Sequence, residues 1–193
     1  MRIEKKIKKI FDKSIEVKKK TNLIPQIQKA VELIYDCYQS GNKVFVCGNG
    51  GSAEQAQHMV AELVGRFKLK RTGLPAIALT TNTPLLTAWA NDYNFETVFA
   101  RELEALGKKG DMLIAISTSG NSENVIQAVK TAKKLKIKSI GLLGKGGKLK
   151  NLVSLPITVP SRETPRIQEV HLLIIHIICE IIEDLIFKKS RKS

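Results

Sequence analysis

The stretch that decides the fold is Asp111-Met112-Leu113-Ile114-Ala115-Ile116-Ser117-Thr118-Ser119-Gly120-Asn121-Ser122. Its apolar first half predicts a buried strand, its second half is a polar loop, and a helical pattern follows from Glu123 to Leu135. In a strand–loop–helix unit, backbone N–H groups and the helix dipole can face an anion. Ser117, Thr118, Ser119 and Ser122 add hydroxyl groups suited to phosphate oxygens, and Gly120 permits a tight turn.

The same loop has a plainer interpretation as a Ser/Thr-rich turn that caps the next helix. It contains no lysine, so it is not the phosphate loop of nucleotide hydrolases. A second loop of similar chemistry favours the anion site over the plain turn. The apolar run 43–47 opens into Gly48-Asn49-Gly50-Gly51-Ser52, and a helix is expected from Ala53 to Phe67.

Gly48, Gly50 and Ala53 also match the G-x-G-x-x-A pattern of dinucleotide-binding folds. The next predicted strand, 75–79, ends in Thr80-Thr81-Asn82 and has no acidic residue placed to hold a ribose. We therefore do not expect a dinucleotide cofactor.

Short apolar runs alternate with helical patterns along the whole chain. The expected strands are 43–47, 75–79, 111–116, 138–143 and 153–159; the expected helices are 2–20, 24–38, 53–67, 84–90, 96–106, 123–135 and 165–187, with a polar turn at Asn91-Asp92. This alternation predicts an α/β fold with a parallel sheet and right-handed crossovers. Ligands of such sheets bind beyond the carboxyl ends of the strands, where both polar loops fall.

Composition narrows the class of protein. The chain has 193 residues, a net charge of +14 and only 5% aromatic residues. Scarce aromatics argue against single-stranded nucleic acid, which stacks on such side chains, so we expect solvated lysine faces and no nucleic-acid partner. No apolar run is long enough to cross a membrane without a charge, and residues 1–20 lack the apolar segment of a secretory signal. Three cysteines without a CxxC pair suggest reduced thiols in the cytoplasm.

Three histidines are the candidates for metal or acid–base chemistry. His58 and Glu62 stand four apart on one predicted helix, which could supply half of a zinc site or form an ordinary exposed pair. His171 and His176 lie on the last helix, together with Gln168. Gln168 and His176 are eight residues apart, about 12 Å along a helix axis. Both can reach one metal only if the helix begins late, if side chains lean together, or if different subunits supply them.

The last helix is apolar almost all round between residues 170 and 186, which implies burial on several sides and favours an oligomer. The helix expected at 2–20 is amphipathic, and we expect its apolar face to pack against a surface outside the helix itself.

Together these residues resemble the sugar isomerase (SIS) domain family and, more narrowly, its phosphoheptose isomerases. The segments that carry the resemblance are Val46–Ala53, Gln57-His58 with Ala61–Phe67, Ala90–Tyr93, Ile116–Ser122, and Arg166–His171 with His176. The similarity runs from about residue 24 to residue 187. The serine loop is common to the superfamily, whereas the His58–Glu62 pair combined with the late helix is more specific.

The resemblance implies a three-layer α-β-α fold with a five-stranded, flavodoxin-like parallel sheet, N-terminal helices and a long C-terminal helix. It implies a single SIS domain over 1–193, with an arm at 1–40 that packs in a homotetramer and a core at 41–187. The implied reaction converts D-sedoheptulose 7-phosphate to D-glycero-D-manno-heptose 7-phosphate for ADP-heptose and lipopolysaccharide synthesis.

The same resemblance assigns roles to particular residues. It implies one Zn²⁺ per subunit, held by His58, Glu62, Gln168 and His176. Glu62 would be the base and His176 the acid. The phosphorylated seven-carbon sugar would contact Asn49, Gly50, Gly51, Glu62, Asn91, Asp92, Ser117, Thr118, Ser119, Ser122 and Gln168.

Two other functions remain open from the sequence. A non-catalytic SIS protein could bind a replication initiator or sense sugar phosphates, and an isomerase could act on a different phosphosugar. A pure binding module has no chemical need for His58, Glu62, Gln168 and His176 together.

Overall fold

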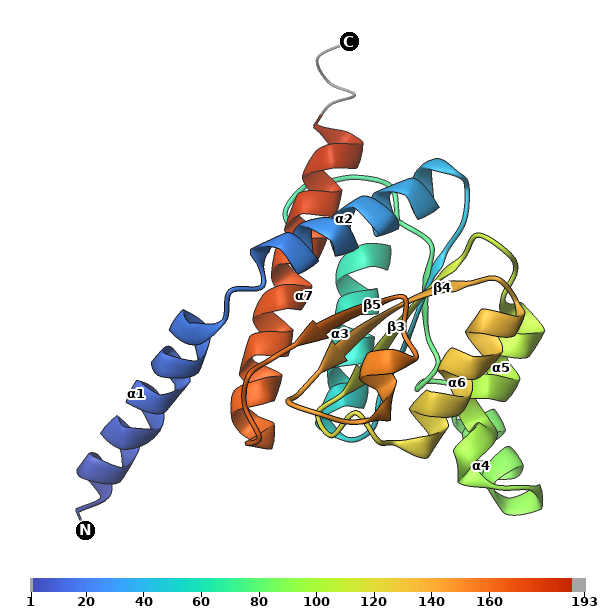
Figure 1. The fold of residues 1–193 in the computed structure, drawn as a ribbon. Helices are drawn as coiled ribbons and strands as arrows, with labels where there is room; N and C mark the ends of the chain where they lie inside the picture. Colours follow the sequence, from blue (N-terminus) through green and yellow to red (C-terminus); the bar gives the residue numbers. More distant parts are fainter. Residues whose placement is uncertain (1, 189–193) are drawn as a thin grey trace.

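The computed structural model describes residues 2–188 (Figure 1). Its α-helices are α1 (Ile3–Lys20), α2 (Ile24–Gln39), α3 (Gly51–Val64), α4 (Thr83–Asp92), α5 (Val98–Leu106), α6 (Glu123–Lys134) and α7 (Thr164–Phe187). Its strands are β1 (Val44–Cys47), β2 (Ala76–Ala78), β3 (Met112–Ser117), β4 (Lys138–Leu143) and β5 (Leu155–Thr158). Two 3₁₀ turns, η1 (Phe95–Thr97) and η2 (Lys148–Asn151), complete the described elements.

The five strands form one sheet in the order β2-β1-β3-β4-β5, and every pair is parallel. This is the flavodoxin-like order, so the predicted fold class is confirmed. The strand order reverses between β1 and β3, because β1 has β2 on one side and β3 on the other. The two polar loops follow these same two strands, which places both at the position where open α/β sheets bind ligands.

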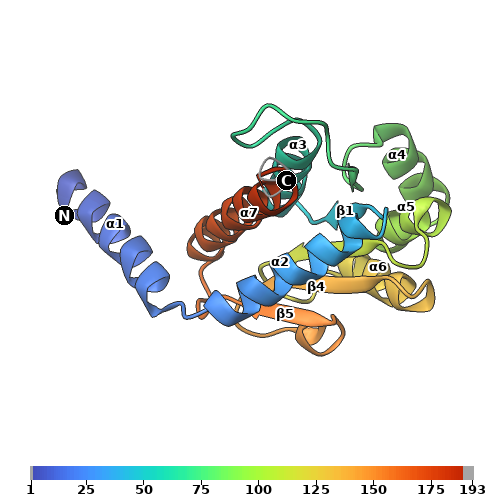
Figure 2. The same cartoon turned by 90° about the horizontal axis from the view of Figure 1, so that it is seen from above.

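Alternate strand residues feed two separate cores, one on each face of the sheet. On β1, Val44 and Val46 join the core beneath α2, α3 and α7, whereas Phe45 and Cys47 join the core beneath α5 and α6. All four are completely buried. Burial on both faces explains why the strands are apolar throughout rather than alternating with polar residues. Figure 2 shows the sheet between these helices.

Most predicted elements are present, with shifted ends. Helix α3 begins at Gly51 and ends at Val64, earlier at both ends than the predicted 53–67. The predicted turn at Asn91-Asp92 is wrong, since both residues belong to the last turn of α4. The helix continues through them because Trp89 and Tyr93, one turn apart, stack with ring centroids 4.2 Å apart.

Helix α1 extends away from the rest of the molecule in both ribbon views (Figures 1 and 2). None of its residues is buried, and Ile3 and Phe11 are 79% and 66% exposed. It is attached to α7 by polar contacts: Ser14 Oγ donates to a Glu169 carboxylate oxygen at 2.6 Å, and Arg166 donates to the Ile10 carbonyl at 3.2 Å. An apolar helix face left in water is unusual for an isolated protein.

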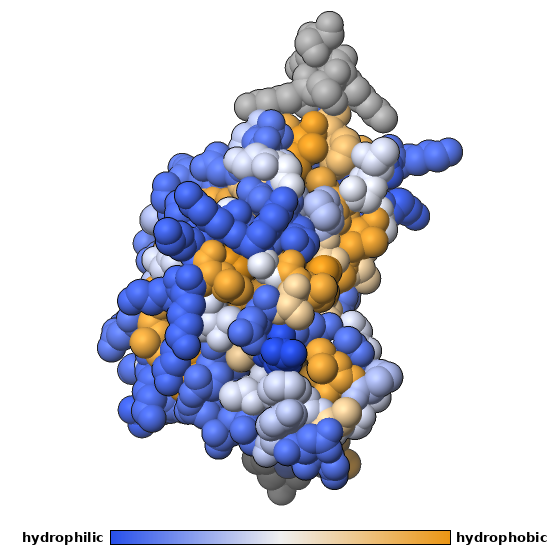
Figure 3. Space-filling model, turned by 90° about the vertical axis from the view of Figure 1, so that its right-hand side faces the viewer, coloured by the Kyte–Doolittle hydropathy of each residue, from blue (hydrophilic) through white to orange (hydrophobic). Residues whose placement is uncertain are grey.

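Within residues 2–188, no helix combines the length and apolarity needed to cross a bilayer. The side of the molecule that carries α4, α5 and α6 in Figure 1 is mostly hydrophilic, with apolar groups in separate patches (Figure 3). The three cysteines, Cys37, Cys47 and Cys179, are free and buried.

Candidate functional site

A pair of amides joins the two polar loops. Asn49, in the loop after β1, and Asn124, in the first turn of α6, exchange two side-chain hydrogen bonds of 2.8 Å. Asn124 is buried, so this exchange satisfies polar groups that would otherwise be costly to bury. The loops after β1 and β3 are therefore held side by side where the strand order reverses.

The hydroxyl groups of the loop after β3 face one another. Ser117 Oγ lies 3.1 Å from Ser122 Oγ and 3.4 Å from Ser119 Oγ, and it accepts a bond from the Gly120 N–H at 3.1 Å. Ser122 is the N-cap residue of α6, yet its side chain makes no capping hydrogen bond. The plainer interpretation of this loop as a capped turn therefore does not account for Ser122. A cluster of hydroxyls at a helix N-terminus suits phosphate oxygens.

Gly120 is required by its surroundings. Its φ is +66°, and a Cβ there would lie 2.6 Å from the carbonyl oxygen of Gly146. Thr118 is half-buried beside it, and Ser119 is exposed at the rim. The loop thus packs closely at Gly120 while Ser119 leaves its rim open to a ligand.

The loop after β1 brings Gln168 into the same region. Gly50 has φ +53°, and a Cβ on Gly51 would lie only 2.5 Å from Gln168 Nε2. The main-chain oxygen of Gln168 also accepts a 2.8 Å bond from Gln55 Nε2 on α3. The Gln168 amide thus lies against the N-terminus of α3, and a side chain at position 51 would displace it.

Three titratable side chains converge farther along α3. His58 Nε2 lies 3.0 Å from His176 Nε2 and 3.5 Å from Glu62 Oε1. The two imidazole rings are tilted by 55° with centroids 5.1 Å apart, and Phe67 packs on His176 with centroids 5.8 Å apart. Glu62 and His58 keep about a quarter to a third of their side-chain surface, at 23% and 34%. A partly open group of two imidazoles and a carboxylate can exchange protons with a small ligand.

Helices α3 and α7 lie side by side and run in the same direction. Gly51 meets Gln168 near their beginnings, His58 meets His176 in the middle, and the Phe67 N–H donates to Glu183 beyond the end of α3. This register explains why Gln168 and His176 are apart: α7 begins at Thr164, so both are helical and about 12 Å separates them along the axis. Of the three predicted ways to join them at one metal, a late helix start is wrong.

The residues fit a metal in part. Two imidazole nitrogens only 3.0 Å apart require one to donate an N–H to the other, or both to direct lone pairs at a shared cation. Two imidazoles and a carboxylate are ligands that zinc prefers. However, no group of three His, Cys, Asp or Glu residues is already arranged as a metal site in the described part of the chain. The side chains of His58, Glu62 and His176 are therefore of the kind that binds zinc, whereas the side chain of Gln168 lies apart from them, against Gly51.

Two predicted sugar contacts lie elsewhere. Asn91 and Asp92 are exposed at the end of α4, where Asn91 Nδ2 donates to Asp92 Oδ1 at 2.9 Å. Within residues 2–188, neither side chain makes a hydrogen bond or ion pair with the two loops or with the histidine pair. His171 is completely buried in the core, and burial lowers its pKa to about 4. It is therefore neutral and separate from the open cluster.

Sequence reasoning missed two residues beside the cluster, Arg71 and Glu183. They form a buried ion pair, with Arg71 Nε 2.8 Å from Glu183 Oε2 and only 2% and 1% of the side chains exposed. The one available signal was the presence of acidic residues, Glu183 among them, in the otherwise apolar second half of the last helix, because a buried carboxylate needs a partner.

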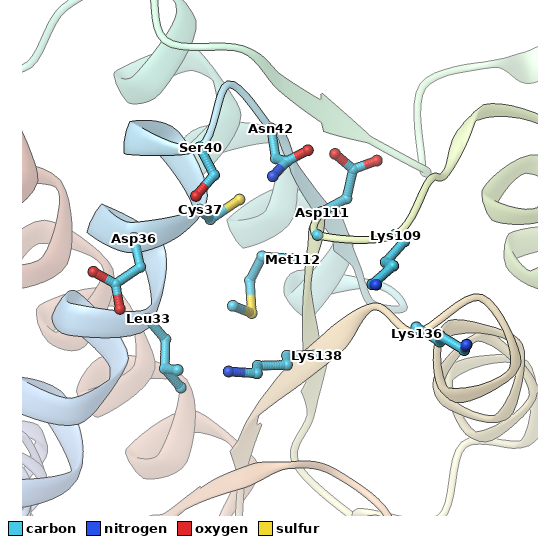
Figure 4. Close-up of a pocket in the computed structure, with 11 residues that line it drawn as sticks. Leu33, Asp36, Cys37, Ser40, Asn42, Lys109, Asp111, Met112, Lys136 and Lys138 are labelled. Carbon is cyan, nitrogen blue, oxygen red and sulfur yellow. The ribbon is translucent and has the colours of Figure 1, made fainter.

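A separate hollow of about 270 Å³ lies at the opposite edge of the sheet, near the amino ends of β3 and β4 (Figure 4). Leu33, Met112, Lys109 and Lys138 are among its lining residues. It contains no predicted site residue. It also lies at the amino ends of the strands, whereas ligands of this fold bind beyond the carboxyl ends.

Comparison with known proteins gives consistent matches. The family model described as "SIS domain" matches residues 8–144. A phosphoheptose isomerase of Clostridium acetobutylicum is 50% identical over 186 residues, covering 96% of this chain and 95% of that relative. One from Geotalea daltonii is 54% identical over 170 residues, covering 88% of each. The solved structure of a phosphoheptose isomerase from Francisella tularensis is 42% identical with a TM-score of 0.92, covering 95% of this chain and all of that one.

Proposed function

We propose that this chain, which belongs to the phosphoheptose isomerases of the SIS domain family and is an isomerase, interconverts D-sedoheptulose 7-phosphate and D-glycero-D-manno-heptose 7-phosphate. The observation that carries the proposal is the convergence of His58, Glu62 and His176 alongside a hydroxyl-lined loop. Gly51 and His58 are seven residues apart on α3, about 10 Å along its axis. The glycine loop before α3 is held to the serine loop by the bonds between Asn49 and Asn124. A span of this size therefore suits an open-chain seven-carbon sugar with its phosphate at the serine loop and its first two carbons at the cluster.

The reaction moves one proton between neighbouring carbons. Glu62 would remove a proton from C1 of the open-chain ketose and return it to C2 of the enediol. His176 would give a proton to the C2 oxygen and accept one from the C1 hydroxyl, so that each group ends as it began. The hydroxyls of Ser117, Ser119 and Ser122 would hold the phosphate and so fix the reacting carbons by proximity.

Zinc is part of the proposal. His58, Glu62, Gln168 and His176 would hold one Zn²⁺ per subunit, which would supply Lewis-acid polarisation of the sugar oxygens. A carboxylate tightly bound to zinc is a weaker base, so Glu62 would leave the metal during turnover or the metal would be mainly structural. For Gln168 to join the other three, its side chain would have to leave its position against Gly51, or a second subunit would have to supply it.

We also propose a homotetramer. The exposed apolar face of α1 and a hollow of about 430 Å³ between α2 and α7, lined by Ile24, Ile27, Val31, Ile177, Ile181 and Leu185, are surfaces that subunit contacts would cover. The free, buried thiols suit a cytoplasmic enzyme. Its product would enter ADP-heptose and lipopolysaccharide core synthesis.

The test is incubation of purified protein with sedoheptulose 7-phosphate, followed by NMR detection of the aldose, with and without a chelator. Accumulation of the manno-heptose phosphate supports the proposal. Turnover of another ketose phosphate alone would reassign the substrate. Phosphosugar binding without any turnover would favour a non-catalytic sensor.

A further inference from the structure

The loop after α3 is held by one carboxylate of α7. Glu183 Oε1 accepts the N–H groups of Lys68 and Leu69 at 2.7 and 2.8 Å, and its Oε2 accepts the N–H of Phe67 at 2.9 Å. Arg71 Nε adds a fourth bond at 2.8 Å. Four bonds on a side chain that is 1% exposed fix the backbone of residues 67–69 to α7.

Arg71 holds the end of α3 in the same way. One of its terminal nitrogens donates to the Glu62 carbonyl at 2.8 Å, and the other donates to the carbonyls of Leu63 and Thr72 at 2.8 and 2.9 Å. The last carbonyls of a helix have no partner within the helix, and here a buried guanidinium supplies one. The residue that receives this bond, Glu62, is the proposed base.

The two contacts meet at the proposed reaction centre. On α7, His176 and Glu183 are seven residues apart and share the face turned to α3, since two helical turns separate them. Glu183 fixes Phe67, whose ring packs on His176, while Arg71 fixes the backbone of Glu62. The ion pair therefore reaches both groups that would exchange protons with the sugar.

We propose that Arg71 and Glu183 are positioning residues of the isomerase, holding the backbone of Glu62 and the ring of His176 at the separation that proton transfer requires. The inference rests on the proposed function and deepens it. Neither residue would touch the substrate, because only 2% and 1% of their side chains are exposed. Displacement of the catalytic groups should slow proton transfer and leave phosphate binding unchanged, because the serine loop makes no contact with this ion pair in the described chain.

The experiment compares Arg71→Lys and Glu183→Gln with a matched control, Asp111→Asn. Asp111 is also a buried carboxylate: it accepts the N–H groups of Lys43 and Lys108 at 3.0 and 2.9 Å and pairs with Lys43 Nζ at 3.0 Å. It lies before β3, at the edge of the sheet opposite the two loops. Activity is measured at a temperature where all variants are folded, as monitored by circular dichroism.

We expect Arg71→Lys and Glu183→Gln to lower kcat by about 10- to 100-fold, since a small misplacement of reacting groups has effects of that size. KM should change less than about threefold, and Asp111→Asn should retain kcat within the same margin. A kcat loss in the two variants no greater than in Asp111→Asn would overturn the proposal, as would a rise in KM with unchanged kcat.

A second readout does not depend on turnover. The chain has three histidines, so each imidazole can be followed by ¹H–¹³C NMR at one pH. Glu183→Gln should shift the ring signals of His58 and His176 and leave buried His171 unchanged, whereas Asp111→Asn should shift none of them. Unshifted His58 and His176 signals would overturn the positioning role. If the wild-type protein failed to isomerise the sugar while these shifts appeared, the proposed reaction would be wrong and the positioning contact would stand.

Discussion

His58 Nε2 lies 3.0 Å from His176 Nε2, although 118 residues separate them in the sequence. The contact exists because α3 and α7 pack side by side over one face of the sheet in the same direction. Glu62 joins the pair one turn farther along α3, at 3.5 Å from His58. Two imidazoles and a carboxylate thus meet in a partly open position that no local sequence pattern specifies.

Replacing Glu62 with Gln should abolish isomerisation. The amide is nearly isosteric but cannot accept the C1 proton, so kcat should fall by about 10²- to 10⁴-fold. Aldose formation from sedoheptulose 7-phosphate measures the loss, and size-exclusion chromatography checks that the assembly is intact. Near-normal turnover would remove Glu62 from the role of base.

Ser119→Ala should weaken binding of the phosphorylated ketose. Ser119 is exposed at the rim of the hydroxyl loop, and a hydrogen bond to a charged group contributes about 1.5–3 kcal/mol. We therefore expect KM to rise by about tenfold or more, with kcat less affected. Ser40→Ala, at an exposed serine of the opposite edge, is the control. An unchanged KM would leave the loop with a structural role alone.

Removal of zinc should inactivate the protein, and added Zn²⁺ should restore it. His58→Ala and His176→Ala should each weaken metal binding by more than about 100-fold, beyond the effect of losing an outer-shell partner. Elemental analysis after dialysis measures bound zinc independently of activity. Gln57→Ala, on the exposed side of α3, should keep its metal. Full zinc occupancy in both histidine variants would rule out this ligand set.

Phe11→Ser should weaken the assembly. Phe11 is 66% exposed on α1. We expect another subunit to cover this apolar side chain in the assembly. Analytical ultracentrifugation should show dissociation at concentrations where the unaltered protein is tetrameric. Lys9→Ser, on the opposite side of the same helix, should have no effect. A monomeric wild-type protein would contradict the proposed assembly directly.

Glu183 should make stability depend on pH. Burial raises the pKa of its carboxyl group, but three backbone N–H groups and the Arg71 guanidinium outweigh burial, so the pKa is lowered from 4.5. A lowered pKa means that the stabilisation is complete above about pH 4.5 and is lost as the pH falls through the folded-state value.

Glu183→Gln should accordingly cost about 3 kcal/mol in the free energy of unfolding at pH 7 and progressively less in acid. Urea unfolding at pH 7 and at pH 3 measures this loss in the free energy of unfolding. Glu180→Gln, one turn earlier and paired with Lys68 at the surface, should cost less than about 1 kcal/mol at either pH. A constant penalty for Glu183→Gln between pH 7 and pH 3 would contradict the role of its charge.

Much of the fold could be predicted because its signals are local. The run 138–143 is a strand with the predicted ends, and the serine loop follows β3 as expected. The predicted turn at Asn91-Asp92 was wrong, because two polar residues need not end a helix when side chains on either side of them interact. Here Trp89 stacks on Tyr93 across this part of α4. Arg71 and Glu183 were missed because an arginine in a basic loop gives no sign of its partner 112 residues away.

The sequence by itself determined the alternation of strands and helices, the parallel sheet and the phosphate-type chemistry of the two loops, since periodicity and loop composition act over a few neighbouring residues. The tertiary structure alone decided that His176 meets His58 while Gln168 meets Gly51, and that Glu183 holds the loop that follows α3. These contacts depend on how α7 docks against α3, which is set by the packing of both helices on the same core rather than by either segment alone.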